Sequence, residues 1–286
     1  MALENVGVSA GMVGLERLTG GRMAGGMARR RRYAGPEGYY WRELALIEIK
    51  DVSKSYNKGA IRAVDHLDLT VNAGEIFGFL GPNGAGKTTM IKMIVGLLRP
   101  DSGSILVNGM DNQCDALRCK SITTYVPDNP DVYERLKGTE YLNFIGDVYR
   151  VDRAKRIERI MRWANVFEIA SELGNPIQSY SHGMRQKIVL MAAFLPEPSV
   201  IVLDEPLVGL DPRAAHELKE AMREHCRRGG TLFFSTHIME VAEKLCDRVG
   251  IIHRGKLVAC GTIPELRAKA GSDQSLEGIF LEVTEK

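Results

Sequence analysis

Long hydrophobic runs are missing from this chain of 286 residues. No stretch approaches the roughly 18–20 uninterrupted apolar residues that a helix needs to cross a membrane. A membrane role would therefore need a partner that does the spanning. Cysteine is scarce too: the chain has five, an odd number, and no C-x-x-C pair. Such usage is typical of reduced thiols in a cytosolic protein and gives no sign of a disulfide framework.

Net charge is also small, at +2, and it is unevenly placed. Residues 1–44 carry seven arginines against four glutamates, with four of the arginines in a run at 29–32 and nine of the thirty glycines. No apolar stretch follows the arginines, which excludes a secretory signal. The remaining chain has no clustered basic charge of the kind that binds nucleic acid. We expect a disordered basic Gly/Arg-rich extension at 1–44 and one folded domain at 45–286.

Residues 81–89 read Gly-Pro-Asn-Gly-Ala-Gly-Lys-Thr-Thr and fill the phosphate-binding loop pattern G-x-x-x-x-G-K-[ST]. An apolar run at 76–80 precedes them and a helix-compatible run at 90–98 follows, which is the strand–loop–helix context that the motif requires. The glycines let backbone N–H groups surround an anion in front of a helix N-terminus. Lys87 can reach the β- and γ-phosphates, and the Thr88 hydroxyl can take a place on Mg²⁺. The segment predicts a nucleoside triphosphate site whose contacts are Asn83, Gly84, Ala85, Gly86, Lys87, Thr88 and Thr89.

Hydrophobic patterning around this loop indicates an α/β fold. Period-2 alternation predicts half-buried strands in an antiparallel layer, and continuous apolar runs predict parallel strands that are covered on both faces. The antiparallel strands are expected at 46–49, 63–71 and 104–108, and the buried parallel ones at 200–203, 232–234 and 249–252.

Helical spacing takes over between about 130 and 190. Apolar residues recur there at i, i+3, i+4 and i+7, which predicts one buried face formed by Ile157, Ile160, Met161, Ala164 and Phe167. The basic residues of the same segment, Arg156 among them, are expected mostly on a solvated face. The whole pattern predicts a P-loop NTPase core with a mostly parallel sheet, an antiparallel β subdomain and an inserted α-helical subdomain.

Two acidic residues follow the apolar run at 200–203. An acidic residue at the carboxyl end of a buried strand lies beside the phosphate crevice in open α/β sheets. Asp204 can hold Mg²⁺, directly or through water, and Glu205 is free to orient and deprotonate an attacking water. His237 follows the strand at 232–234, which we expect to neighbour the Asp204 strand, so His237 falls within reach of a γ-phosphate. The predicted catalytic residues are Glu205, His237 and Lys87.

These motifs, in this order, resemble an ATP-binding cassette (ABC) ATPase over about residues 45–286. Residues 181–186 (Ser-His-Gly-Met-Arg-Gln) look like the ABC signature, usually written L-S-G-G-Q. The resemblance implies that Ser181 and Gly183 meet the ATP held by another subunit, in a homodimer or a paralogue heterodimer with ATP at the interface. It also places Asp211 in the D-loop at that interface, makes His237 the switch histidine and makes Tyr56 the aromatic residue that stacks on adenine.

The chain departs from the family pattern at four positions. Asp128 stands where the family usually has glutamine, and a carboxylate there could still touch Mg²⁺ through water. Within and beside the signature, Tyr180, His182 and Met184 replace leucine, glycine and glutamine. Ser181 and Gly183, which carry the implied phosphate contacts, are retained. We therefore expect the chemistry to be retained.

The closer resemblance is to the ATPase subunits of ABC-2-type exporters, through the form of the signature, the segment 131–136 and the tail 275–284. It implies an ATP hydrolase that converts MgATP to ADP and phosphate at the cytoplasmic face of the cell membrane. Such a subunit is peripheral, powers a separate multi-span permease and binds no nucleic acid. Two alternatives remain open: a soluble ABC ATPase acting on ribosomes or DNA, and a small-molecule kinase of another phosphate-loop class.

Overall fold

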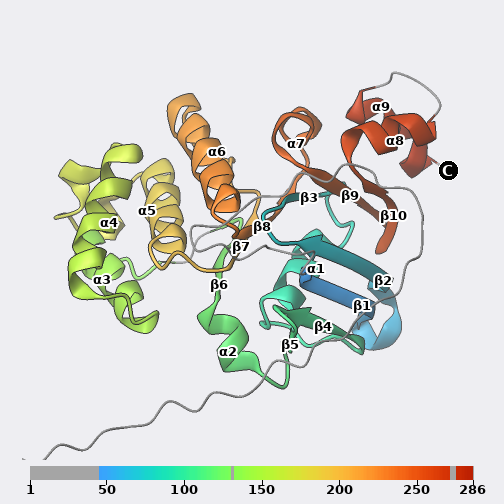
Figure 1. Cartoon of the computed structure of the whole chain (residues 1–286), viewed down its shortest axis with the longest axis horizontal. Helices are drawn as coiled ribbons and strands as arrows, with labels where there is room; N and C mark the ends of the chain where they lie inside the picture. The colour runs from blue at the N-terminus through green and yellow to red at the C-terminus, as the bar shows by residue number, and fades with distance from the viewer. Residues whose placement is uncertain (1–44, 130–131, 271–274, 286) are drawn as a thin grey trace, which may run out of the picture. The chain divides into compact units, whose positions relative to one another are not determined.

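The computed structural model describes residues 45–129, 132–270 and 275–285, so the predicted extension at 1–44 lies outside the described residues. An antiparallel sheet with the strand order β2-β1-β4-β5 forms from the alternating segments (Figure 1). Its strands are β1 (Ala45–Tyr56), β2 (Ile61–Asn72), β4 (Ser102–Val107) and β5 (Met110–Asp111), with a 3₁₀ turn η1 (Asn57–Gly59) between the first two.

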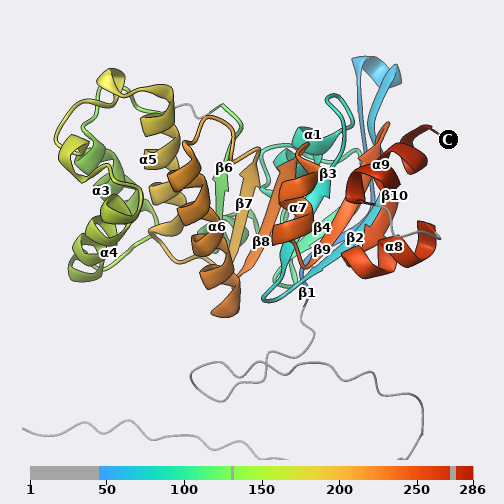
Figure 2. The ribbon, with the colours of Figure 1, turned by 90° about the horizontal axis from the view of Figure 1, so that it is seen from above.

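A second sheet of six strands has the order β10-β9-β3-β8-β7-β6. All its neighbouring pairs are parallel except β10 with β9. Because β3, β8 and β7 are adjacent and parallel, their carboxyl ends meet at one edge, where the candidate site forms (Figure 2). The strands are β3 (Ile76–Leu80), β6 (Thr123–Val126), β7 (Val200–Asp204), β8 (Thr231–Thr236), β9 (Arg248–His253) and β10 (Lys256–Gly261).

The helix α1 (Lys87–Ile94) begins directly after the phosphate-binding loop and packs against both sheets. Met90, Ile91 and Met93 on this helix are fully buried, and they share a core with apolar side chains from β1, β2, β4, β7 and β8. The short helix α2 (Ala116–Ser121) follows β5. The core around α1 fixes the loop that precedes the helix.

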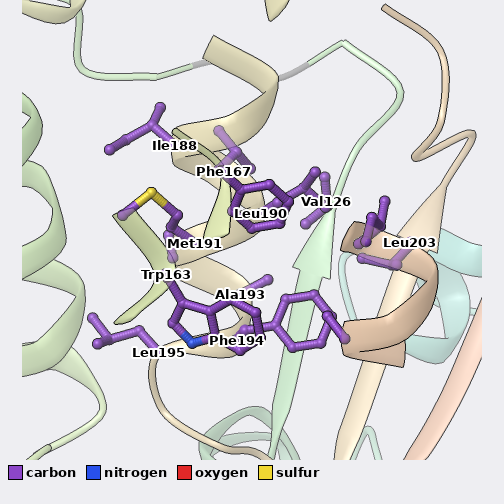
Figure 3. Close-up of a cluster of buried hydrophobic side chains, with 14 of the residues drawn as sticks. Val126, Trp163, Phe167, Ile188, Leu190, Met191, Ala193, Phe194, Leu195 and Leu203 are labelled. Carbon is purple, nitrogen blue, oxygen red and sulfur yellow. The ribbon is translucent and has the colours of Figure 1, made fainter. Parts of the chain in front are cut away.

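Helices of the middle of the chain form another core beside β6 and β7 (Figures 1 and 3). Trp163 stacks on Phe167 and lies 4.9 Å from Phe194, measured between ring centroids. Val126 and Leu203 join the same cluster from the sheet, so the helices are anchored to it by hydrophobic burial. The elements are α3 (Gly138–Val148), α4 (Arg153–Val166), η2 (Ala170–Glu172), η3 (Ile177–Ser179), α5 (His182–Phe194) and α6 (Pro212–Arg227).

The predicted buried face of α4 is wrong in two positions. Ile160 is buried as expected, but Ile157 and Met161 are 57% and 48% exposed. Arg156, expected in solvent, is buried instead. Its guanidinium donates hydrogen bonds to the backbone carbonyls of Asn143 and Val151 and pairs with Asp147 at 2.6 Å. These bonds pair both terminal nitrogens of the guanidinium, and Gly146 of α3 leaves the room for it, since a Cβ there would lie 2.4 Å from Arg156 Nε.

Three further helices pack at the other end of the sheet, around Leu80, Val249 and Ile251. They are α7 (Met239–Leu245), α8 (Ile263–Ala270) and α9 (Leu276–Glu285). A capping box opens α8, in which Thr262 N–H donates to Glu265 Oε2 at 3.0 Å. Within the described ranges, no helix is long and apolar enough to cross a membrane. The predicted fold class, with a mostly parallel core, an antiparallel layer and inserted helices, is confirmed.

Candidate functional site

The phosphate-binding loop joins β3 to α1, and its shape depends on glycine. Gly84 and Gly86 adopt positive φ angles of 79° and 112°, a region that side chains disfavour. A Cβ on Gly86 would also lie 2.2 Å from the carbonyl oxygen of Ala63. Gly86 is the N-cap of α1 and has no side chain to cap the helix. The backbone N–H groups of the first turn can therefore face an anion.

Lys87 folds back over this loop. Its side chain is 7% exposed, and Nζ donates to the carbonyl oxygen of Gly81 at 2.7 Å. The same Nζ lies 3.7 Å from Oε1 of Glu205. A buried ammonium group is stable only when it is paired and hydrogen-bonded, so the loop carbonyl and the carboxylate hold this cation at the mouth of the loop.

Asp204 ends β7 with its side chain buried, and hydroxyl groups occupy both carboxylate oxygens. Thr88 Oγ1 donates to Oδ2 at 2.8 Å, and Ser235 Oγ donates to Oδ1. Ser235 Oγ also accepts from the backbone N–H of Glu205 at 3.1 Å. One buried hydroxyl on β8 therefore positions both acidic residues. Sequence reasoning missed Ser235, although a serine among apolar residues at the carboxyl end of a neighbouring strand was a usable signal.

Glu205 and His237 lie together after β7 and β8, two strands that the sequence predicts to be neighbours. Glu205 has a left-handed backbone (φ 49°), and its carboxylate is 12% exposed, with Oε1 3.0 Å from Nδ1 of His237. Its second oxygen, Oε2, is buried and has no hydrogen-bond partner among the described residues. Buried polar atoms in folded proteins are normally hydrogen-bonded, so this oxygen is an available acceptor. It has the position and the capacity to accept a hydrogen bond from a water molecule.

Asp128 and Tyr125 complete this edge of the sheet. Asp128 is exposed, just beyond β6. Burial raises the pKa of the Tyr125 hydroxyl, and the charges of Asp204 and Asp128 raise it further, so both carboxylates are within electrostatic reach of that hydroxyl. Sequence reasoning did not single out Tyr125.

The donors present fit Mg²⁺ bound together with a substrate. Among the described residues, no group of three or more histidine, cysteine or acidic side chains could hold a metal by itself. Mg²⁺ usually takes one or two protein oxygens and completes its shell with phosphate oxygens and waters. The hydroxyl of Thr88 and the carboxylate of Asp204, 2.8 Å apart beside the phosphate-binding loop, are such a pair.

A second helix N-terminus carries the signature-like residues. Ser181 is the N-cap of α5, and its hydroxyl accepts from the backbone N–H of Met184 at 3.2 Å. Ser181 and His182 are exposed. Gly183 lies against Gly209, because a Cβ on Gly183 would be 3.1 Å from the Gly209 carbonyl oxygen. The ring of His182 covers the other side of Gly209, so the signature-like turn and the loop before α6 form one continuous exposed surface.

Asp211 ties that surface to α6. It is the N-cap of this helix, accepting from the backbone N–H of Ala214 at 2.8 Å, and its Oδ2 lies 2.8 Å from Nζ of Lys187 on α5. The hydrogen bond from Lys187 is the largest cause that lowers the pKa of the Asp211 carboxyl. Tyr56 lies apart from these residues in the fold, as the 39% exposed last residue of β1.

Comparison with known proteins gives one consistent family. Residues 64–208 match the family model described as ABC transporter. The chain is 35% identical over 244 residues to the ABC-type transporter ATP-binding protein EcsA of Bacillus subtilis, covering 85% of this chain and 98% of EcsA. It is 35% identical over 228 residues to the daunorubicin resistance ATP-binding protein DrrA3 of Streptomyces coeruleorubidus, covering 80% of this chain and 72% of that protein.

A solved structure described as the ATP binding subunit of an ABC transporter superposes with a TM-score of 0.80 at 35% identity. It covers 83% of this chain and 99% of that one.

Proposed function

The chain belongs to the ABC transporter family as an ATP-binding subunit, and from this premise we propose that it hydrolyses ATP to power export through a separate membrane permease. The observation that carries the proposal is the convergence of Lys87, Glu205 and His237 beside the phosphate-binding loop. The buried Oε2 of Glu205, which has no hydrogen-bond partner in the described part of the chain, lies in the same cluster. A site that only bound ATP would not require a buried acceptor for a water proton.

The residues divide the work of phosphoryl transfer between them. Backbone N–H groups at 83–89 and the Lys87 ammonium bind the β- and γ-phosphates and stabilise the charge that moves onto the leaving oxygen. Tyr56 provides a partly exposed ring for the adenine. Thr88 and Asp204 would hold Mg²⁺, with Asp128 acting through water, and the ion supplies charge neutralisation on the phosphate oxygens.

Glu205 acts as the base. A water oxygen attacks the γ-phosphorus, the bond from that phosphorus to the β–γ bridging oxygen breaks, and ADP leaves with the electron pair. The water proton passes to the Glu205 carboxylate. His237 lies 3.0 Å from the same carboxylate, so it can hold Glu205 in place and donate a hydrogen bond toward the γ-phosphate.

The exposed surface at Ser181, Gly183 and Asp211 serves a second copy of the chain or a paralogue. The hydrogen bonds and ion pairs of Ser181 and Asp211 are made with residues of α5 and α6, which leaves the α5 N-terminus open to a phosphate from outside. In the proposed dimer, each α5 N-terminus faces the ATP held by the partner's phosphate-binding loop, and two nucleotides are shared.

The direction of transport and the partner are proposed from relatives. DrrA3 is described as a daunorubicin resistance protein, and removal of a toxic compound from the cell is the simplest meaning of resistance. We propose that this chain likewise drives export, bound to a multi-span permease at the cytoplasmic face of the membrane. EcsA is described as the ATP-binding protein of a transporter, which supports this proposal over an ATPase acting on ribosomes or DNA.

The decisive experiment is Glu205→Gln. This change keeps the size of the side chain and removes the base, so we expect MgATP binding to persist while turnover falls by about 10²–10⁴-fold. Dimers should accumulate with ATP and be detectable by size-exclusion chromatography with light scattering. Lys87→Ala is the matched comparison, because it should lose nucleotide affinity instead. Turnover near the wild-type rate in the Glu205→Gln variant would remove Glu205 as the base.

A further inference from the structure

A short antiparallel ladder joins the segment after Asp128 to the segment that enters α5. Ile177 N–H donates to the Leu136 carbonyl at 2.9 Å, and Thr139 N–H donates to the Leu173 carbonyl at 2.9 Å. Between these bonds, Lys137 and Pro176 form an isolated bridge. Residues 134–139 and 173–178 are therefore tied to each other along the backbone.

The end of this ladder at Glu134 and Gln178 is the end that leads into α5. From Gln178 the chain continues to Tyr180, which is buried and donates from its hydroxyl to the Glu172 carbonyl at 2.7 Å. Ser181, the N-cap of α5, comes next. A short stretch of chain thus joins the paired backbone to the anion-binding turn at Ser181.

Arg185 closes the ladder at the end nearest Ser181. Its Nη1 lies 2.7 Å from Oε1 of Glu134, and its Nη2 donates to the Gln178 carbonyl at 3.2 Å. Gln178 N–H in turn donates to the Glu134 carbonyl at 2.8 Å. One guanidinium, one turn into α5, therefore holds both segments of the ladder at once.

Lysine could not make this connection, because its ammonium lacks the fixed fork of donors that spans a carboxylate and a carbonyl. Neither Arg185 nor Glu134 contacts the phosphate-binding loop, Asp204 or Glu205 in the hydrogen bonds and ion pairs of the described chain. Any effect of the pair on ATP turnover must act through the position of α5.

We infer that Arg185 and Glu134 are positioning residues that hold the α5 N-terminus, with Ser181, in place against the segment 134–139. The pair sets how well two copies close over shared ATP and leaves binding at the phosphate-binding loop unchanged. This inference rests on the proposed function, because it concerns the same pair of shared sites.

The test uses the full chain carrying Glu205→Gln, so that MgATP is bound without turnover. Into it we introduce Glu134→Gln, Arg185→Gln, both together, and Arg185→Lys. MgATP affinity is measured by calorimetry at protein concentrations below dimer formation. The dimer dissociation constant is measured by analytical ultracentrifugation with saturating MgATP. Glu220→Gln is the control, because it breaks the Arg223–Glu220 pair on α6 (2.5 Å), away from the ladder.

We expect each single variant to weaken the dimer by about tenfold, within the range of coupling between sites, while MgATP affinity changes less than twofold. The double variant should be no worse than either single one, because both remove the same interaction. Arg185→Lys should weaken the dimer by a similar factor, and the control should not. A general loss of folding would lower both affinities and would contradict the inference.

Dimers of unchanged strength in the Glu134 and Arg185 variants would overturn the inference and leave the proposed function standing. Failure of the parent Glu205→Gln protein to form a dimer with MgATP is a different result. It would remove the shared sites from the proposed function, and this inference with them.

Discussion

Ser235→Ala removes one hydroxyl that two catalytic residues share. Ser235 Oγ donates to Oδ1 of Asp204 and accepts from the backbone N–H of Glu205 at 3.1 Å. All three atoms lie at the carboxyl ends of β7 and β8, and Asp204 is 1% exposed. The variant leaves a buried carboxylate oxygen without its donor. It also leaves Glu205 N–H with only the Ser235 carbonyl, at 3.3 Å.

The magnitude follows from the kind of bond that is lost. A hydrogen bond to a charged group contributes about 1.5–3 kcal/mol. If that loss falls on the transition state, it corresponds to about 10- to 150-fold in kcat/KM. Asp204 keeps its bond from Thr88, so we expect MgATP affinity to fall less than turnover. Steady-state release of phosphate at several Mg²⁺ concentrations, together with calorimetry for MgATP, separates the two effects.

A matched control lies on the same strand. Thr231 Oγ1 donates to the Asn72 carbonyl at 2.8 Å at the amino end of β8, remote from the acidic residues. Thr231→Val removes a buried hydroxyl and should lower the melting temperature without a comparable loss of turnover. If Ser235→Ala and Thr231→Val reduce turnover equally, or if Ser235→Ala leaves turnover within twofold of wild type, the positioning argument for Ser235 is refuted.

Two further predictions concern the loop and the fold. Gly86→Ala should lose more nucleotide affinity and thermal stability than Gly84→Ala: both have positive φ, but only a Cβ at Gly86 meets an atom, the Ala63 oxygen at 2.2 Å. Nucleotide affinity is measured by calorimetry and stability by melting curves. Equal affinities and equal melting temperatures in the two variants would contradict this prediction. Burial lowers the pKa of His225 to about 4, so His225 contributes stability that is present in full above about pH 6.5 and is lost as the pH falls toward 4. Relative to His225→Phe, the wild type should lose about 2 kcal/mol of unfolding free energy between pH 7 and pH 5, as measured by urea titration. Burial raises the pKa of Glu75, which has the opposite effect on stability, but Glu75 is present in both proteins and its contribution cancels in the comparison.

The site was largely predictable because parallel strands bring distant residues to one edge. Apolar runs before Gly81, Asp204 and Ser235 predicted buried strands, and buried parallel strands expose the residues at their carboxyl ends along one edge of the sheet. That rule is enough to bring Lys87, Glu205 and His237 together. It did not single out Ser235 or Tyr125, because it says where buried strands end and not which polar side chains near those ends contact one another.

The helices show where hydrophobic patterning no longer predicts which residues are buried. On α4, the apolar spacing predicted a buried face that included Ile157 and Met161, yet both are exposed while Arg156 is buried. The deciding feature is on another helix. Gly146 of α3 leaves space for the Arg156 guanidinium, which pairs with Asp147 and bonds the Val151 carbonyl. Hydrophobic periodicity predicts which residues share a face of a helix. Which face is buried depends on the neighbouring helix that packs against it.

The departures at the signature can be judged in the same terms. Anion binding at a helix N-terminus depends on backbone N–H groups and on the cap, and neither is changed by the side chains of His182 and Met184. Ser181 still caps α5, and its hydroxyl bonds the backbone N–H of Met184 whatever side chain that residue carries. His182 instead packs over Gly209, whose φ of 80° and lack of a Cβ make room for the ring. The histidine therefore adds a contact between the signature-like turn and the loop before α6, and the backbone donors that would face a phosphate are retained.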